Sequence, residues 1–278
     1  MVSPQDPPSD ACEILTISAK NFTEHASFAE SVKGIICAAK HYQLLTVTDV
    51  PLGWEDSLWE ADEDLPANRK TYDPITGLLR VSIMPTNGHD VASGWLSRTM
   101  VRWTRAGLTI PQEEDILYTM SDASIDFKYG VYRGWRKQPD AAFRIGGLNL
   151  PTLVVEVGWS EGYPDLLDDM NKLLVGGNGD IRAVIIIKFT QQGVNVSGFL
   201  EVYRLNSQGI PYLAQDETVF PTPQGQAAAQ QQVRVTRSEL FGKFLVPGMT
   251  GADILPLDVD WLRSICRSQI ALMGLVPV

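Results

Sequence analysis

The sequence predicts a mixed α/β protein, with a central mixed sheet flanked by helices. Residues 182–189 form a continuous β-branched run, which is typical of a central strand buried on both faces. A second buried strand is predicted at 152–157, and an apolar stripe at helical spacing predicts a helix at 164–174. These three elements together indicate a strand–helix–strand crossover. Large apolar residues at helical spacing over 90–105 predict another helix, with its tryptophans in the core.

The other elements follow from the same patterns. Apolar residues at helical spacing predict helices at 24–41 and 258–273. Alternating or short apolar runs predict strands, which are expected at 78–84, 115–120, 124–129, 140–145 and 198–205. The residues between 189 and 198 would then form the turn of a hairpin. The glycine-rich segment 176–179 follows a helix, so we interpret it as a cap and turn rather than a phosphate-binding loop.

Composition and length describe an ordinary globular chain of 278 residues, of which 44% are hydrophobic and 20% charged. We expect one large core with elaborations. Residues 1–11 are a predicted tail, 12–70 a helical and loop elaboration, and 71–205 the core. The C-terminal extension, 206–278, would contain a glutamine-rich loop at 221–232 before the final helix.

Several features favour an intracellular protein, either cytoplasmic or nuclear. The N-terminus is polar and proline-rich and has no apolar segment of the kind that signal peptides contain. The longest apolar stretches are far shorter than the roughly 20 residues that a membrane-spanning helix needs. Three cysteines cannot all pair, which fits a reducing compartment. The formal net charge of −10 argues against nucleic-acid binding through bulk electrostatics.

Two carboxylates are the most informative residues for chemistry. Asp140 follows a proline at the start of a predicted strand, and Glu156 interrupts the apolar strand that comes next. Neighbouring strands can bring such side chains together, and paired carboxylates are suitable ligands for Mg²⁺ or Mn²⁺. The alternative interpretation is that Glu156 is a strand-end glutamate bonded to the backbone or to an arginine.

A series of short motifs resembles the PD-(D/E)XK nuclease superfamily. The series runs from Tyr72-Asp-Pro-Ile-Thr-Gly and Met84-Pro through Gly88-His-Asp to Pro139-Asp and Glu156-Val-Gly-Trp-Ser. It is similar to Uma2-like endonucleases and to fungal proteins with the same restriction-endonuclease-like core. The resemblance covers about residues 70–190. It implies an α-β-β-β-α-β core and metal-dependent phosphodiester hydrolysis, with Asp140 and Glu156 as the metal ligands.

The chain departs from this family at one position. The family motif places a lysine two residues after the second carboxylate, where this chain has Gly158. Relatives can supply the lysine from the next helix, so Lys172 is our first candidate and Lys188, on the following strand, the second. The resemblance also makes His89, which precedes the first core helix, a candidate base or metal ligand.

The sequence leaves the function open between two main hypotheses. The first is a metal-dependent nuclease, and the second is a catalytically inactive nuclease-like fold that serves as a binding module. An enzyme acting on a small molecule near Trp159 and Tyr163 is a third. Nucleic acid would bind a local basic surface, for which the expected residues are Arg98, Arg102, Arg136 and Lys137. The resemblance adds a homodimer, because many nucleases of this fold dimerise.

Overall fold

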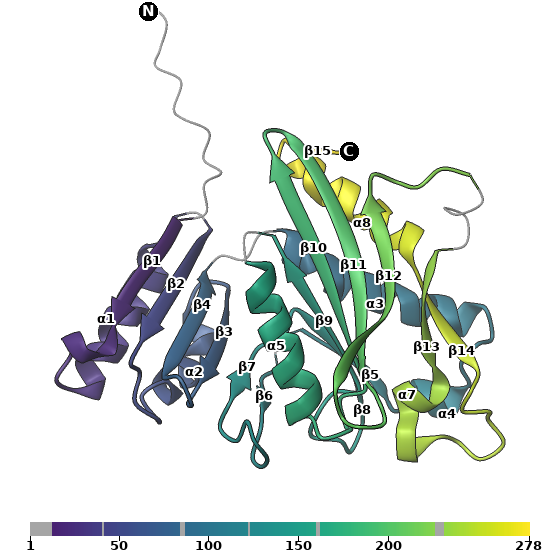
Figure 1. Ribbon diagram of the computed structural model, residues 1–278, viewed down its shortest axis with the longest axis horizontal. Coiled ribbons are helices and arrows are strands. Elements are labelled where there is room, and N and C mark those ends of the chain that lie inside the picture. The colour runs from purple at the N-terminus through teal and green to yellow at the C-terminus, as the bar shows by residue number, and fades with distance from the viewer. Residues whose placement is uncertain (1–12, 41, 84–86, 122, 160–161, 226–230) are drawn as a thin grey trace, which may run out of the picture. The chain divides into compact units, whose positions relative to one another are not determined.

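The computed structural model describes residues 13–40, 42–83, 87–121, 123–159, 162–225 and 231–278 (Figure 1). These residues form an α+β protein in which helices flank mixed sheets, as the sequence predicts. The chain divides into two compact units. One comprises Met1–Pro85 with Trp135–Lys137, and the other comprises Thr86–Gly134 with Gln138–Val278. No helix among the described residues is long and apolar enough to cross a membrane.

The first unit is a small sheet with its own core. Its strands are β1 (Glu13–Ser18), β2 (Gln43–Thr48), β3 (Asn68–Asp73), β4 (Leu78–Ile83) and β7 (Arg136–Lys137). They lie in the order β1-β2-β4-β3-β7, and only β1 and β2 are parallel. Between β1 and β2 come a 3-10 turn, η1 (Ala19–Asn21), and α1 (His25–Ala38), while α2 (Asp56–Glu60) and η2 (Asp62–Asp64) precede β3.

The core of this unit explains why these segments fold together. One face of α1 buries Phe28, Val32 and Ile36 against the apolar residues of β2 and β4. The sequence interpretation of 12–70 as helices and loops missed the three strands in this region. The expected boundary at residue 71 also differs from the structure, because β3 and β4 belong to the first unit.

The second unit is built on a seven-stranded sheet. Its main path runs β12-β11-β10-β9-β8-β5, and a short β15 (Val276–Pro277) pairs with β11. The path strands are β5 (Leu117–Met120), β8 (Ala141–Ile145), β9 (Leu153–Gly158), β10 (Ala183–Gln192), β11 (Asn195–Leu205) and β12 (Pro211–Phe220). Strands β9 and β10 are parallel and are joined by α5 (Tyr163–Gly176), which confirms the predicted crossover. The other neighbours on the path are antiparallel.

Helices cover both faces of this sheet (Figure 1). α3 (Asn87–Arg105) and α8 (Val259–Leu272) pack together on one face, where Trp95 and Trp103 join Phe143, Val155 and Ile185 in a single core. This confirms that the tryptophans of α3 are core residues. α5 packs on β9, β10 and β11. After α5, Asn178 and Gly179 adopt positive φ angles, as the predicted cap and turn requires.

The C-terminal region is part of the second unit's core rather than an appendage. β12 extends the sheet, and β13 (Gln232–Thr236) and β14 (Ile254–Asp258) form an antiparallel ribbon whose apolar residues join the core around α3. The shorter elements are α4 (Pro111–Glu114), β6 (Ile125–Asp126), α7 (Arg237–Phe241) and η3 (Gly242–Phe244). The predicted tail at 1–11 lies outside the described residues, as do positions 226–230 of the predicted loop.

Candidate functional site

The two predicted carboxylates come from adjacent antiparallel strands. Glu156 lies within β9, and Asp140 immediately precedes β8. Ala141 pairs with Val155, so the same register continued by one residue places Asp140 opposite Glu156. Both residues are buried, with exposed fractions of 5% and 2%. Two carboxylates that the sequence separates by sixteen positions are therefore cross-strand neighbours.

A backbone hydrogen bond orients Asp140. Its Oδ2 accepts a hydrogen bond from the backbone N–H of Val157 at 2.7 Å, inside the protein. The carboxylate thus satisfies a β9 amide at the position where β8 begins. One oxygen of Asp140 therefore has a structural role, and the residue is at the same time the cross-strand neighbour of Glu156.

Glu156 faces the side of the sheet that α5 covers. Val155 and Val157 belong to the core around α3, and alternation along the strand turns Glu156 and Gly158 to the opposite face. A Cβ atom added at Gly158 would lie 2.3 Å from Cδ1 of Leu166 in α5. This contact identifies the covering helix. A side chain at position 158 would therefore require Leu166 to move.

Lys188 lies directly beside this glycine. It is the register partner of Gly158 on β10, and its Cδ is 3.2 Å from where a Cβ of residue 158 would be. The Lys188 ammonium donates a hydrogen bond to the carbonyl of Trp159 at 3.0 Å. Strand β10 therefore places the side chain of Lys188 on the same face of the sheet as Glu156. Of the two lysine candidates, Lys188 is the one whose strand register places it beside Gly158.

Lys172, the first candidate from the sequence, lies on α5 and is 8% exposed. Its ammonium forms an ion pair with Asp168 at 2.7 Å, one helical turn earlier. Asp169, between them in sequence, is fully buried. The helix thus has two charged residues within its buried surface, whereas the sequence pattern predicted a mainly apolar stripe.

Sequence reasoning missed a polar cluster on the same face. Ile186 pairs with Glu156 on one side and with Glu201 of β11 on the other, so the two glutamates occupy one row of the sheet. The hydroxyls of Tyr163 and Tyr203 donate to Glu201 Oε2 at 2.7 and 3.0 Å. Burial is the main cause that raises the pKa of each tyrosine. Only the strand register connects these residues with Glu156, so no local signal could have found them.

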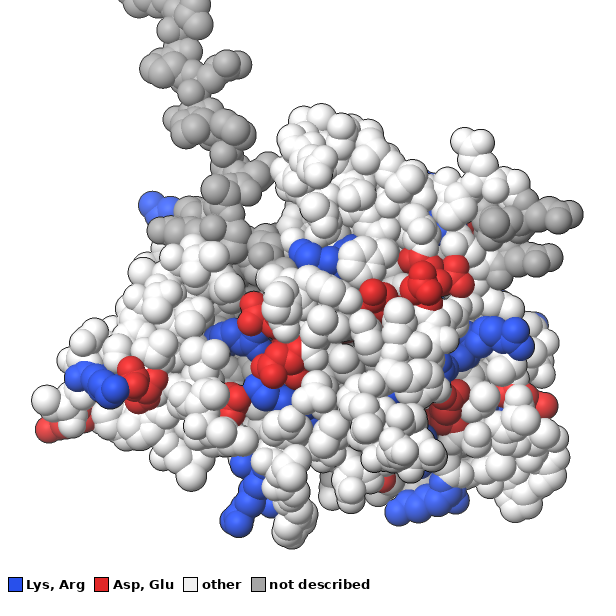
Figure 2. All heavy atoms as spheres, in the orientation of Figure 1, with Lys and Arg blue, Asp and Glu red and all other residues white. Residues whose placement is uncertain are grey.

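The remaining predicted residues belong to different units of the chain. His89 belongs to α3, but its side chain lies outside the described residues. Arg98 and Arg102 are on α3 in the second unit, whereas Arg136 pairs with Asp56 in the first unit. Lys137 is buried, with its ammonium 3.4 Å from the Thr71 hydroxyl, so it does not contribute to an exposed basic surface. On the face drawn in Figure 2, basic side chains are scattered among acidic ones.

The donor set limits what metal site this arrangement can form. Within the described part of the chain, no group of three or more His, Cys, Asp or Glu side chains is arranged to hold a metal ion. Two carboxylates, one just before β8 and one in β9, still match how Mg²⁺ is commonly bound, through one or two carboxylates with waters and substrate phosphates completing its shell. The residues thus fit a cation that the substrate helps to bind.

No protein-family model matches this chain, and no curated protein matches it.

Proposed function

We propose that this protein hydrolyses phosphodiester bonds of nucleic acid with the help of Mg²⁺ or Mn²⁺. The observation that carries the proposal is the cross-strand placement of Asp140 and Glu156 in the sheet of the second unit. With the short α4, β6 and β7 left out, the elements around this pair follow one another as α3-β5-β8-β9-α5-β10. This order is similar to the α-β-β-β-α-β core that the resemblance to PD-(D/E)XK nucleases implies, and it supports the proposal for that reason. In that superfamily the two carboxylates hold the metal from the same strand positions.

Each residue has a definite role in this proposal. Asp140 and Glu156 would hold the cation, and the bound metal supplies an activated water and polarises the phosphoryl oxygen. Lys188, beside Gly158, would place its ammonium where negative charge develops on the phosphate and the attacking oxygen. To do so the ammonium would leave the Trp159 carbonyl, to which it donates at 3.0 Å.

One set of contacts favours the alternative, a catalytically inactive fold that serves as a binding module. Asp140, Lys172 and Lys188 each have a partner inside the protein, namely Val157 N–H, Asp168 and the Trp159 carbonyl. Such bonds would persist in a fold that has lost its metal chemistry. The experiments must therefore test metal binding and hydrolysis separately.

Calorimetric titration of Mn²⁺ tests the metal site without a choice of substrate. We expect binding to the wild-type protein and its loss in Glu156→Gln and Asp140→Asn, which keep the shape of each side chain. Asp216→Asn is the matched control, because Asp216 is an exposed carboxylate on β12, where it is the register partner of Glu201 on β11. The absence of Mn²⁺ binding in the wild type would overturn the proposed metal site.

Hydrolysis assays then separate the two lysines. With Mn²⁺ and single-stranded DNA, duplex DNA or RNA, we expect Lys188→Met to lose about 10²–10³-fold in rate, the usual effect of removing one transition-state donor. Lys172→Met, its matched control, should stay within about tenfold of the wild type. A wild type that binds Mn²⁺ but cleaves none of the three nucleic acids would support the inactive alternative instead.

A further inference from the structure

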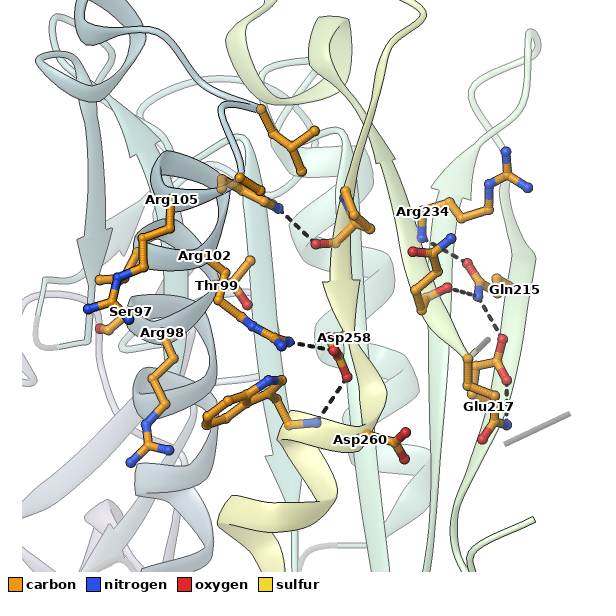
Figure 3. A pocket seen from close by; sticks show the side chains of 18 residues that line it. Ser97, Arg98, Thr99, Arg102, Arg105, Gln215, Glu217, Arg234, Asp258 and Asp260 are labelled. Atoms are coloured by element: carbon orange, nitrogen blue, oxygen red, sulfur yellow. Dashed lines mark hydrogen bonds and ion pairs between the residues drawn. The ribbon is translucent and has the colours of Figure 1, made fainter. Parts of the chain in front are cut away.

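The second unit contains a groove of about 1310 Å³ between α3, β12 and the β13–β14 ribbon (Figure 3). Its walls are tied to one another. The indole N–H of Trp103 in α3 donates to the carbonyl of Pro256 at 2.8 Å. On the other side, the amide of Gln215 in β12 donates to the carbonyl of Gln232 at 2.8 Å. The groove is therefore a formed feature of the unit, larger than the roughly 300–1,000 Å³ of a typical small-molecule site.

Each of the three acidic side chains of the groove has partners within the protein: two are paired with arginines, and the third accepts hydrogen bonds from neutral amides. Asp258 forms an ion pair with Arg102 and caps α8 by accepting from the Trp261 N–H at 3.1 Å. Asp260 pairs with the buried Arg263 at 2.6 Å. The third, Glu217, accepts hydrogen bonds from the amides of Gln215 and Gln231 at 2.8 and 2.7 Å.

Three arginines of the groove have no such partner. Arg98 and Arg105 extend from α3 and Arg234 from β13, so guanidinium groups lie on two sides of the groove (Figure 3). All three are exposed, and no acidic side chain among the described residues forms an ion pair with any of them. The guanidinium of Arg98 lies over the ring of Trp261, with 5.3 Å between its Cζ and the ring centroid, which restricts its orientation.

We infer that this groove binds a single strand of nucleic acid through its phosphates. Uncompensated guanidiniums on two sides match a chain of phosphate groups, which arginine binds with two parallel hydrogen bonds. A flexible single strand can enter a groove in the protein. Duplex DNA is instead recognised by a protein helix or β-ribbon that projects into the grooves of the DNA. The choice of nucleic acid over an acidic peptide rests on the proposed function.

The groove is separate from the carboxylates. It lies on the side of the sheet where α3 packs, whereas Glu156 faces α5. We therefore assign to the groove the anchoring of a strand segment away from the bond that is cut. Loss of its arginines should raise KM for long substrates and leave kcat nearly unchanged.

Fluorescence anisotropy with a labelled 20-nucleotide oligothymidylate in EDTA tests the groove without metal or hydrolysis. The triple variant Arg98→Gln, Arg105→Gln, Arg234→Gln should bind at least about tenfold more weakly than the wild type. Its plot of log affinity against log salt should be shallower by about 2, since each phosphate contact on a single strand contributes about 0.7 to the slope.

The matched control removes the same charge elsewhere on the second unit. Lys128, Arg133 and Lys243 are exposed and do not line the groove, so their triple substitution to Gln should change affinity by less than about twofold. Equal weakening by both triple variants would mean that binding reflects net charge alone and would overturn the inference. Absence of oligothymidylate binding by the wild type would also overturn it.

Two further results distinguish this inference from the proposed function. If the protein binds the strand through the three arginines but hydrolyses no nucleic acid, the proposed nuclease activity is wrong and the inferred binding groove is supported. If hydrolysis occurs and the arginine substitutions do not affect it, the inferred role of the groove is wrong and the proposed nuclease activity stands. If polyglutamate binds with the same dependence on the arginines and oligothymidylate does not, the partner is an acidic peptide and the inference is wrong.

Discussion

Gly158 and Lys188 are neighbours on adjacent strands, and the absence of a side chain at one position shapes the surroundings of the other. The absence of a side chain at Gly158 lets Leu166 of α5 pack directly on β9. Lys188, its register partner, then occupies the adjoining space on the same face. Close packing in protein interiors makes such a position intolerant of even one added carbon. The glycine is therefore a packing requirement of the β9–α5 contact as well as a departure from the motif.

Gly158→Ala should consequently destabilise the protein by about 1–3 kcal/mol, the usual cost of overpacking a core. The added Cβ would lie 2.3 Å from Leu166 Cδ1, so the helix or its leucine must move. Urea unfolding of the second unit measures the change. Gly94→Ala in α3 is the control, since its Cβ would meet only Ile265 Cδ1, at 3.9 Å. That variant should gain up to about 1 kcal/mol from helix propensity. A neutral Gly158→Ala would contradict the proposed packing.

At the scale of elements, the β9–α5–β10 crossover positions Glu156 and Lys188, and a buried ion pair connects other elements of the second unit. Arg237 at the start of α7 forms an ion pair with Glu113 of α4. Their side chains are only 5% and 0% exposed. Arg237 also donates to the Leu108 carbonyl at 2.7 Å, which fixes the end of the loop after α3. One guanidinium thus connects α7 with α4 and with the loop after α3.

Glu113→Ala should cost about 3 kcal/mol of the free energy of unfolding, because it removes the buried carboxylate partner of Arg237 and leaves only the half-exposed Asp253, 3.5 Å from its Nε. Lys128→Ala breaks an exposed pair with Asp126 and should cost less than about 1 kcal/mol. Chemical denaturation of both variants gives the comparison. If the two losses are equal, the Arg237–Glu113 pair does not hold α4 and α7 together in the way that its burial indicates.

At the scale of the whole molecule, the chain folds as two units and crosses between them more than once. After entering the second unit it returns Trp135–Lys137 to the first, where β7 pairs with β3. The sheet of the first unit therefore includes residues more than sixty positions away from β3 in sequence.

Phe28→Ala tests this division, because Phe28 is fully buried in the first unit's own core. We expect a loss of about 3–5 kcal/mol from the cavity. In hydrogen exchange resolved by residue, the amides of Arg136 and Lys137 should then exchange faster together with those of β3 and β4. The amides of β8, only a few residues later, should stay protected. Phe143→Ala in β8 should give the converse pattern. Equal acceleration in both units would show that they unfold as one.

The sequence by itself determined the elements whose signals are local. The spacing of Val91, Trp95 and Trp103 placed α3 and its buried face, and the β-branched run at 182–189 placed β10. Two buried strands around an amphipathic helix also determined the parallel crossover, since a helix packed on the sheet is the usual connection between parallel strands. Each of these conclusions depends on residues within one or two helical turns or strand lengths.

Only the tertiary structure decided which distant residues became neighbours. Strand register set Glu201 in the row of Glu156 and Lys188 beside Gly158, and a one-residue shift would have turned those side chains to the other face. Folding likewise brought Arg234 to the groove lined by the arginines of α3, and returned β7 to the first unit. Strand register and packing depend on interactions between segments that are far apart in the chain. No short segment of the sequence contains them.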